Sequence, residues 1–261
     1  MNRNQNLFAV LALGVAASVA PAMTSAQTVP VAAGKTWSGY AGAGVASFPK
    51  YTGGKGAEIN VVPLLLFEYK ETFYVDFLRA GVRLWTSEDK KLALGIAAEP
   101  RFGFKAQDGV LLSGMAKRKS SIEVGPSLEW ETKLASFNVA MFSDVTGASK
   151  GASLRATVYK QFIDTAQWDI GAYAGLERED RKVTNYYFGV PAAEVTASRA
   201  LYQPGTATHW TLGVSGAWKF SPRYALMFGI QNTRLGAASA NSPIVETRNA
   251  PIAYVGLGWQ L

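Results

Sequence analysis

Apolar residues alternate with small or polar ones in segment after segment of this chain, and this period of two restricts its fold more than any other feature. Trp168, Ile170 and Ala172, for example, alternate with Asp169 and Gly171. Successive side chains of a strand point to opposite faces of a sheet, so each such segment predicts a strand with one apolar face. The pattern predicts about twelve strands, near residues 36–47, 59–70, 72–78, 81–86, 91–104, 121–131, 133–144, 151–163, 166–177, 208–220, 222–234 and 251–261.

The connections between these strands differ in length in a regular way. Short ones, such as residues 131–133 and 221–222, alternate with long ones, such as 105–120 and 178–207. A single exception is a short connection at Arg79-Ala80, where a long one is expected. Outer-membrane barrels have short periplasmic turns and long outer loops. The sequence therefore predicts an all-β fold, a transmembrane antiparallel β-barrel in the outer membrane with short periplasmic turns and long extracellular loops.

The charge content agrees with a wall that faces lipid. Only 17% of the residues are charged and the mean hydropathy is +0.04, whereas average proteins have about 25% charged residues. The charges fall mainly at inward positions. Charges of both signs occur there and can pair with one another, which favours a narrow or occluded lumen but does not exclude a conducting one. The predicted lumen-lining residues are Arg83, Glu99, Arg101, Glu123, Glu129, Arg155, Asp169, Glu177 and Lys219.

Tryptophan is concentrated at one end of the predicted barrel. Five of the seven tryptophans lie on the apolar face beside a short turn or a chain end: Trp37, Trp130, Trp168, Trp218 and Trp259. Amphipathic rings prefer the boundary between membrane and water. We therefore expect an aromatic girdle at the periplasmic interface, in contact with outer-membrane lipid.

The first residues have the three parts of a secretory signal peptide. Arg3 supplies a positive charge, Leu7 to Ala20 form an apolar stretch, and small residues lead to Ala26. This arrangement predicts a cleaved signal for Sec export in residues 1–26 and a barrel in residues 27–261.

Few residues suggest catalysis or metal binding. The chain has no cysteine and one histidine, which excludes disulfides and sites that need two imidazoles. His209 lies near Ser198 and Ser215, but no nucleophile motif surrounds either serine. We therefore expect a solvated or interfacial histidine and no enzyme, no cofactor and no metal. The Asp144 loop lacks the spacing of a calcium loop, and a turn is the better interpretation.

The longer loops leave two further alternatives open. The basic triplet at residues 117–119 is typical of a solvated loop, although it could touch anionic lipid head groups. The other basic residues are scattered, so we expect no nucleic-acid partner. Tyr186, Tyr187 and Phe188 could anchor a protein partner, or the loop that carries them could fold back over the barrel mouth.

Five short segments, in order along the chain, resemble motifs of the MipA/OmpV family of outer-membrane proteins. They lie at residues 49–54, 63–69, 144–151, 186–194 and 242–245. The resemblance implies a non-enzymatic barrel, and a role as a scaffold that links a murein transglycosylase to a penicillin-binding protein. It also leaves open a small-solute channel, or a surface adhesin that acts through residues 178–207.

Overall fold

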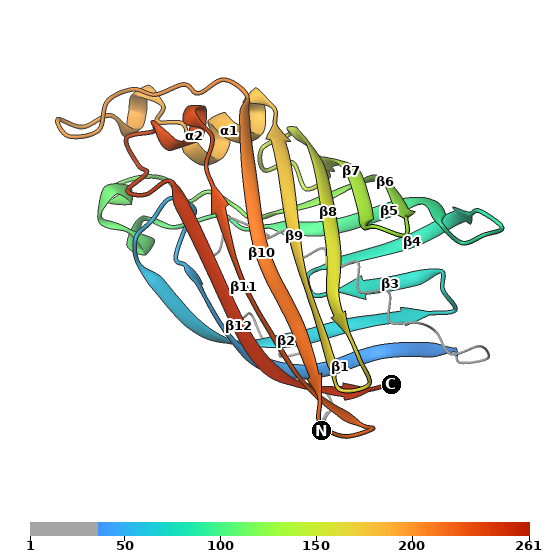
Figure 1. Ribbon diagram of the computed structural model, residues 1–261. Coiled ribbons are helices and arrows are strands. Elements are labelled where there is room, and N and C mark those ends of the chain that lie inside the picture. The colour runs from blue at the N-terminus through green and yellow to red at the C-terminus, as the bar shows by residue number, and fades with distance from the viewer. Residues whose placement is uncertain (1–35) are drawn as a thin grey trace, which may run out of the picture.

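In the computed structural model, which describes residues 36–261, antiparallel strands form a closed barrel of twelve strands (Figure 1). Each strand pairs with its neighbours in sequence, and β1 pairs with β12 to close the sheet. The strands are β1 (Trp37–Pro49), β2 (Ala57–Tyr69), β3 (Phe73–Asp76), β4 (Arg79–Thr86), β5 (Leu92–Arg101), β6 (Ser121–Glu131), β7 (Ser136–Asp144), β8 (Ala152–Asp164), β9 (Trp168–Glu179), β10 (Ala207–Lys219), β11 (Tyr224–Arg234) and β12 (Asn249–Gln260). The predicted fold class and strand number are confirmed.

The outer loops contain the helical elements. They are α1 (Arg181–Phe188), α2 (Ala237–Ala240) and the short 3-10 helices η1 (Ala106–Asp108), η2 (Val110–Leu112) and η3 (Ala192–Glu194). Figure 1 shows α1 and α2 gathered with the long loops at one end of the barrel. Within residues 36–261, no helix has the length and apolar character needed to cross a membrane. The predicted signal peptide, residues 1–26, lies outside the described residues.

Tyrosine rings lie against glycines inside the barrel. Gly213 on β10 is the register partner of Tyr173 on β9, and a Cβ atom at Gly213 would lie 2.3 Å from the Tyr173 Cζ. Gly229 on β11 is related in the same way to Tyr254 on β12, at 2.5 Å from its Cε1. The missing side chains leave room for the flat rings to lie close against the neighbouring strands.

The β3–β4 hairpin is much shorter than the others. It turns at Phe77 and Leu78, and β4 begins at Arg79. The sequence-based placement of this turn at Arg79-Ala80 was wrong by two residues. Phe77 has a φ of 52°, which is strained for a bulky residue. Its ring contacts Tyr254 at 5.2 Å between centroids, and this contact draws the hairpin tip toward the lumen.

Candidate functional site

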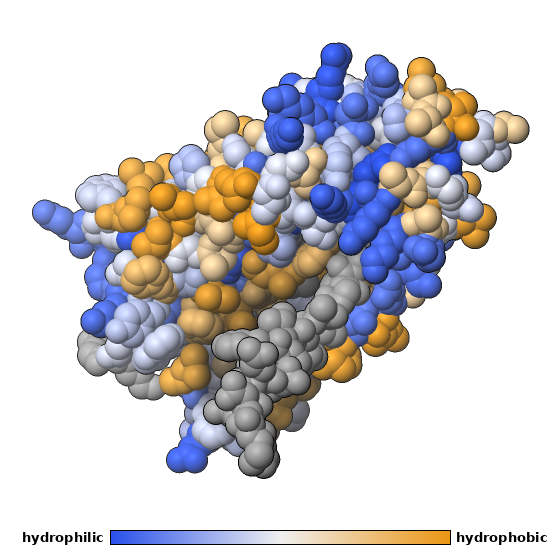
Figure 2. Space-filling model, turned by 180° about the vertical axis from the view of Figure 1, so that it is seen from behind, coloured by the Kyte–Doolittle hydropathy of each residue, from blue (hydrophilic) through white to orange (hydrophobic). Residues whose placement is uncertain are grey.

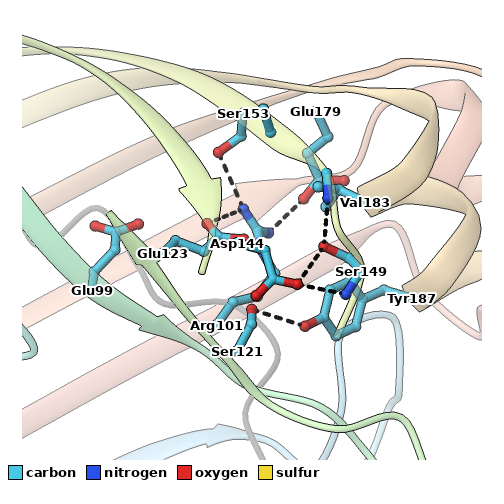
Figure 3. A network of polar contacts seen from close by, with 12 residues as sticks. Glu99, Arg101, Ser121, Glu123, Asp144, Ser149, Ser153, Glu179, Val183 and Tyr187 are labelled. Atoms are coloured by element: carbon cyan, nitrogen blue, oxygen red, sulfur yellow. Dashed lines mark hydrogen bonds and ion pairs between the residues drawn. The ribbon is translucent and has the colours of Figure 1, made fainter. Parts of the chain in front are cut away.

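Arg101 on β5 is the centre of a buried group of charges inside the barrel (Figure 3). Its guanidinium contacts three carboxylates, each at 2.6 Å: Nε to Glu123 Oε1, Nη2 to Glu177 Oε1 and Nη1 to Glu179 Oε1. The strands place these residues on the lumen face because each one occupies an inward position of the period-two pattern. One arginine thus connects β5, β6 and β9.

Arg155 on β8 extends this group to a network. It binds Glu177 at 2.9 Å and also contacts Glu99, which accepts from Arg79 Nη2 at 3.1 Å. His209 on β10 joins from the other side, with Nε2 3.1 Å from Glu179 Oε2. The network therefore extends from β4 to β10. Three arginines face four carboxylates, and His209 Nδ1 accepts from the Gly236 N–H at 3.1 Å, which leaves Nε2 as the nitrogen that faces Glu179.

A buried network of this kind depends on the pairing of its charges. Charges removed from water are stable only when each has partners. Removing one partner of a buried pair costs about 3–5 kcal/mol, because the other is left uncompensated. The network therefore ties together the strands that carry its residues.

The outer loops form a roof over this network. Arg118 Nη2 lies 2.6 Å from Glu194 Oε2, and Arg199 Nη1 donates to the Leu111 carbonyl at 2.7 Å. The hydrogen bond from Arg118 holds the pKa of Glu194 below its usual range. These contacts join loop 102–120 to loop 180–206. At the next loops, Tyr51 donates to the carbonyl of Ile244 at 3.0 Å.

The aromatic residues of the longest loop point into this roof. Tyr187 and Phe188 are each only 4% exposed. The Tyr187 hydroxyl lies 3.2 Å from Ser121 Oγ, burial raises its pKa to about 12, and Phe188 contacts His209. Of the two interpretations of this loop, the structure favours the one in which it folds back over the mouth. Tyr186 remains partly exposed, whereas the expectation that Tyr187 and Phe188 offer their rings to a partner is corrected by their burial.

The loop at Asp144 is a turn organised by one carboxylate. Asp144 accepts backbone N–H groups of Thr146, Gly147, Ser149 and Lys150, at 2.7 to 3.0 Å. These bonds use the oxygens that a cation would need. Within residues 36–261, no group of three or more His, Cys, Asp or Glu side chains is arranged to hold a metal ion.

The other end of the barrel carries an open, charged cleft of about 580 Å³. Arg83 lies in its wall, 2.9 Å from Glu68 and 2.8 Å from Glu129. Lys90 and Glu71 pair at its rim, at 2.7 Å. This end has the short turns, so the cleft faces the periplasm in the predicted orientation.

The five tryptophans predicted to form the girdle lie on the outer surface near the same end. Each is between 39% and 54% exposed. Trp168 stacks on Trp218 at 5.7 Å, and further ring contacts lead through Phe220 and Tyr224 to Trp259. This belt of rings marks the level at which the membrane boundary is expected.

The structure divides the predicted lumen residues into two groups. Glu99, Arg101, Glu123, Arg155 and Glu177 meet in the network. Arg83 and Glu129 lie in the cleft, and Asp169 and Lys219 are partly buried on paired strands close to that end.

Four members of these two groups were missed from the sequence. Arg79 was assigned to a turn, but β4 begins at this residue. Glu179 was assigned to the long loop, because the predicted strand ended at residue 177, whereas β9 continues to Glu179. His209 was expected to be solvated or interfacial, but it is 4% exposed and lies 3.1 Å from Glu179 inside the barrel. Glu68 lies at an inward position of β2, where the period-two pattern could have indicated it.

Comparison with known proteins identifies the family. A family model described as MltA-interacting protein MipA matches residues 41–261. The chain belongs to this family. The match covers nearly the whole described barrel, so the resemblance seen in the short motifs is confirmed.

Two curated relatives of this MltA-interacting protein family member are outer-membrane proteins. It is 31% identical over 148 residues to "Outer membrane protein Omp26La" of Vibrio anguillarum, and 29% identical over 148 residues to "Outer membrane protein OmpV" of Vibrio cholerae. Each alignment covers 55% of this chain and 57% of the relative, so the chain spans less than two thirds of their length. The protein is an outer-membrane β-barrel.

Solved structures that resemble the chain are also barrels. The NanC porin has a TM-score of 0.46 at 10% identity and covers 85% of this chain and 100% of its own. The translocator domain of the autotransporter NalP from Neisseria meningitidis has a TM-score of 0.47 at 9% identity, with coverage of 87% and 89%. At these values the likeness says nothing about activity.

Proposed function

We propose that this protein is a non-enzymatic interaction platform of the outer membrane rather than an open channel. The observation that carries the proposal is the contrast between the two ends of the barrel. The lumen is crossed by the Arg101 network and roofed by the outer loops, whereas the periplasmic end keeps an open cleft that holds charges of both signs.

A small-solute channel is the main rival function. Such a channel needs a continuous wet path, whereas paired ions and the Tyr173 and Tyr254 rings project from the wall into the lumen. A surface adhesin is the second rival, and it has to act without the Tyr187 and Phe188 rings, because these are buried. Both rivals therefore have less structural support than a platform.

The family description suggests the kind of partner. It names interaction with MltA, a murein transglycosylase, and we propose such an enzyme as the periplasmic partner of this chain. A scaffold of this type would hold a penicillin-binding protein as a second partner. Short turns offer little area by themselves, so the cleft beside Arg83 is the best candidate for the contact.

A site-specific photocrosslinker tests this role. Glu88 lines the cleft, is exposed and has no ion-pair partner among the described residues. A photoreactive amino acid at Glu88 in the full-length protein, expressed in cells, should crosslink a murein transglycosylase. The matched control is the same probe at Val110, which is 88% exposed on an outer loop. Equal recovery from both positions, or none from Glu88, would contradict the platform.

Planar bilayer recordings separate the platform from the channel. The purified barrel should give no stepwise conductance in neutral salt. A regular single-channel conductance, with an ion selectivity that changes in Glu123→Gln or Arg155→Gln, would establish the channel instead.

A further inference from the structure

The short β3–β4 hairpin leaves a gap in the barrel wall. β3 pairs with β2 only from Leu66 to Tyr69, and β4 pairs with β5 only up to Ala98. Among residues 36–261, no strand pairs with the β3-facing edge of β2 at residues 57–64. We call this region, between β2 residues 57–64 and the outer end of β5, the lateral gap.

The lateral gap lies at the depth of the outer leaflet. Tyr69, at the other end of β2, belongs to the aromatic belt through its contacts with Trp37 and Phe73. The eight residue-to-residue steps from Val61 to Tyr69 correspond to about 20 Å along the membrane normal, at about 3.3 Å per step and a tilt of about 40°. The apolar band of such barrels is about 25 Å tall. Ile59 and Val61 are 75% and 66% exposed on the outer surface, as residues in hydrocarbon are.

A proline lies on each side of the lateral gap. The backbone nitrogen of each proline faces the gap and has no hydrogen to donate. The Leu65 carbonyl accepts from the Phe77 N–H on the β3 side, so the backbone groups of odd-numbered residues of β2, including Pro63, face the gap. The Leu92 carbonyl accepts from Ser87 on the β4 side, so the groups of even-numbered residues of β5, including Pro100, face it too. Prolines at both edges remove ladder donors and oppose the addition of a further strand. The occupant of the gap is therefore not a peptide strand.

The barrel interior behind the lateral gap is apolar, unlike the side that holds the Arg101 network. Val62 and Leu64 point inward from β2 and pack with Tyr254, while Phe77 forms the lower limit. Phe48, Phe102 and Ile252 belong to an adjoining apolar cluster. Figure 2, which views the molecule from behind, shows hydrophobic residues around a hollow on that face. The lipid-facing wall thus continues through the gap into an apolar interior.

Positive charges surround the outer end of the lateral gap. Lys50 and Lys55 lie in the loop before β2, and Lys105 follows the end of β5; all three are exposed. None has an ion-pair partner among the described residues, although the Asp108 carboxylate accepts from the Lys105 backbone N–H. Lysines at this level complement a phosphate group at the membrane surface.

We propose that the lateral gap is a port that admits an acyl chain of an anionic lipid, one whose phosphate charge is not neutralised within its own head group, from the outer leaflet. The chain enters between Pro63 and Pro100, contacts the partly buried Val62, reaches Leu64, which is 1% exposed, by displacing the side chains packed over it, and ends above the Phe77 ring. The phosphate remains outside, at Lys50, Lys55 and Lys105. The strained φ of Phe77 is retained because it keeps the ring in the lumen as the floor of the port.

Photolabelling of the full-length barrel in phosphatidylcholine vesicles tests the port. The probe is phosphatidic acid with a diazirine in its acyl chain, and mass spectrometry locates the adducts. Adducts are expected on inward-facing Val62 and Leu64 as well as on outward-facing Val61. Inward-facing Thr157, on the fully paired strand β8, is the control and should carry none. Adducts confined to outward-facing residues would overturn the proposal.

Two variants test the parts of the port separately, with folding checked by the heat-dependent gel shift. Reversing the three lysines to glutamate should lower the Val62 and Leu64 adducts several-fold for the phosphatidic acid probe. A phosphatidylcholine probe should label them weakly in both proteins. Equal inward labelling by both probes, unchanged by the reversal, would overturn the assignment to an anionic lipid.

The second variant, Phe77→Gly, tests the floor. Glycine adopts a φ of 52° without strain, so the turn should be kept while the ring is lost. Adducts should then extend to Tyr254. An unchanged adduct pattern would overturn the role of Phe77.

Discussion

The Nη1 of Arg101 lies 2.6 Å from the Oε1 of Glu179, although 78 residues separate the two in the chain. This contact holds β5 against β9 across the lumen. It is the longest-range ion pair of the network in terms of sequence separation.

Replacing Arg101 should destabilise the barrel strongly. Arg101→Met leaves Glu123, Glu177 and Glu179 buried without their common partner, at a cost of about 3–5 kcal/mol. The temperature at which the folded form disappears on a semi-native gel should fall clearly. Arg178→Met, an exposed arginine on β9, is the matched control and should leave that temperature nearly unchanged. Equal temperatures for both variants would show that the network does not brace the barrel.

The tyrosine–glycine packing predicts a large difference between two glycines. In Gly213→Ala the new methyl group would overlap the Tyr173 ring, and overpacking of this kind costs about 1–3 kcal/mol. In Gly175→Ala the nearest atom is 3.6 Å away, so the substitution should be neutral or slightly stabilising. Urea unfolding followed by tryptophan fluorescence measures both. A Gly175→Ala variant as unstable as Gly213→Ala would contradict the packing.

The roof should loosen in acid. The hydrogen bond from Arg118 lowers the pKa of Glu194 in the folded loop below its ordinary value of about 4.3. Stabilisation by this carboxylate is therefore complete above about pH 5 and is lost as the pH falls through the lowered pKa. Hydrogen exchange in residues 181–206 should be slow near neutral pH and faster in acid, after correction for the intrinsic rate.

The matched variant for the roof is Glu194→Gln. It removes the titrating group, so protection of the loop should be weaker at neutral pH and should depend less on pH. Wild-type protection that stays constant down to the lowest pH would exclude Glu194 as the tie between the loops.

Much of the barrel was predictable because its wall obeys a strict period of two. The lipid-facing side excludes charge, so the inward positions of Arg101, Glu123 and Arg155 could be identified before any coordinates. Alternation is a poor guide where the period breaks. A register shift between Arg83 and Trp85 places Trp85 on the outer surface at 51% exposure. Strict alternation from Arg83 puts it inside.

Contacts between distant segments could not be predicted. The sequence has one histidine at the end of a long loop, and nothing local indicates that Glu179 lies beside it. The same holds for Arg118 and Glu194, 76 residues apart, whose pairing decides that the long loop covers the mouth. Such pairs depend on which strands the closed sheet brings together.

The order of events in folding follows from the network described above. Its ion pairs join residues 20 to 78 positions apart on strands from β4 to β9, so they form only when the sheet has curled far enough to bring those strands face to face. Contacts that form late contribute little to the speed of assembly and mainly slow the reverse reaction. The barrel should therefore be long-lived in the membrane because of a high barrier to opening, and that lifetime is set by ion pairs hidden at its centre rather than by the lipid outside.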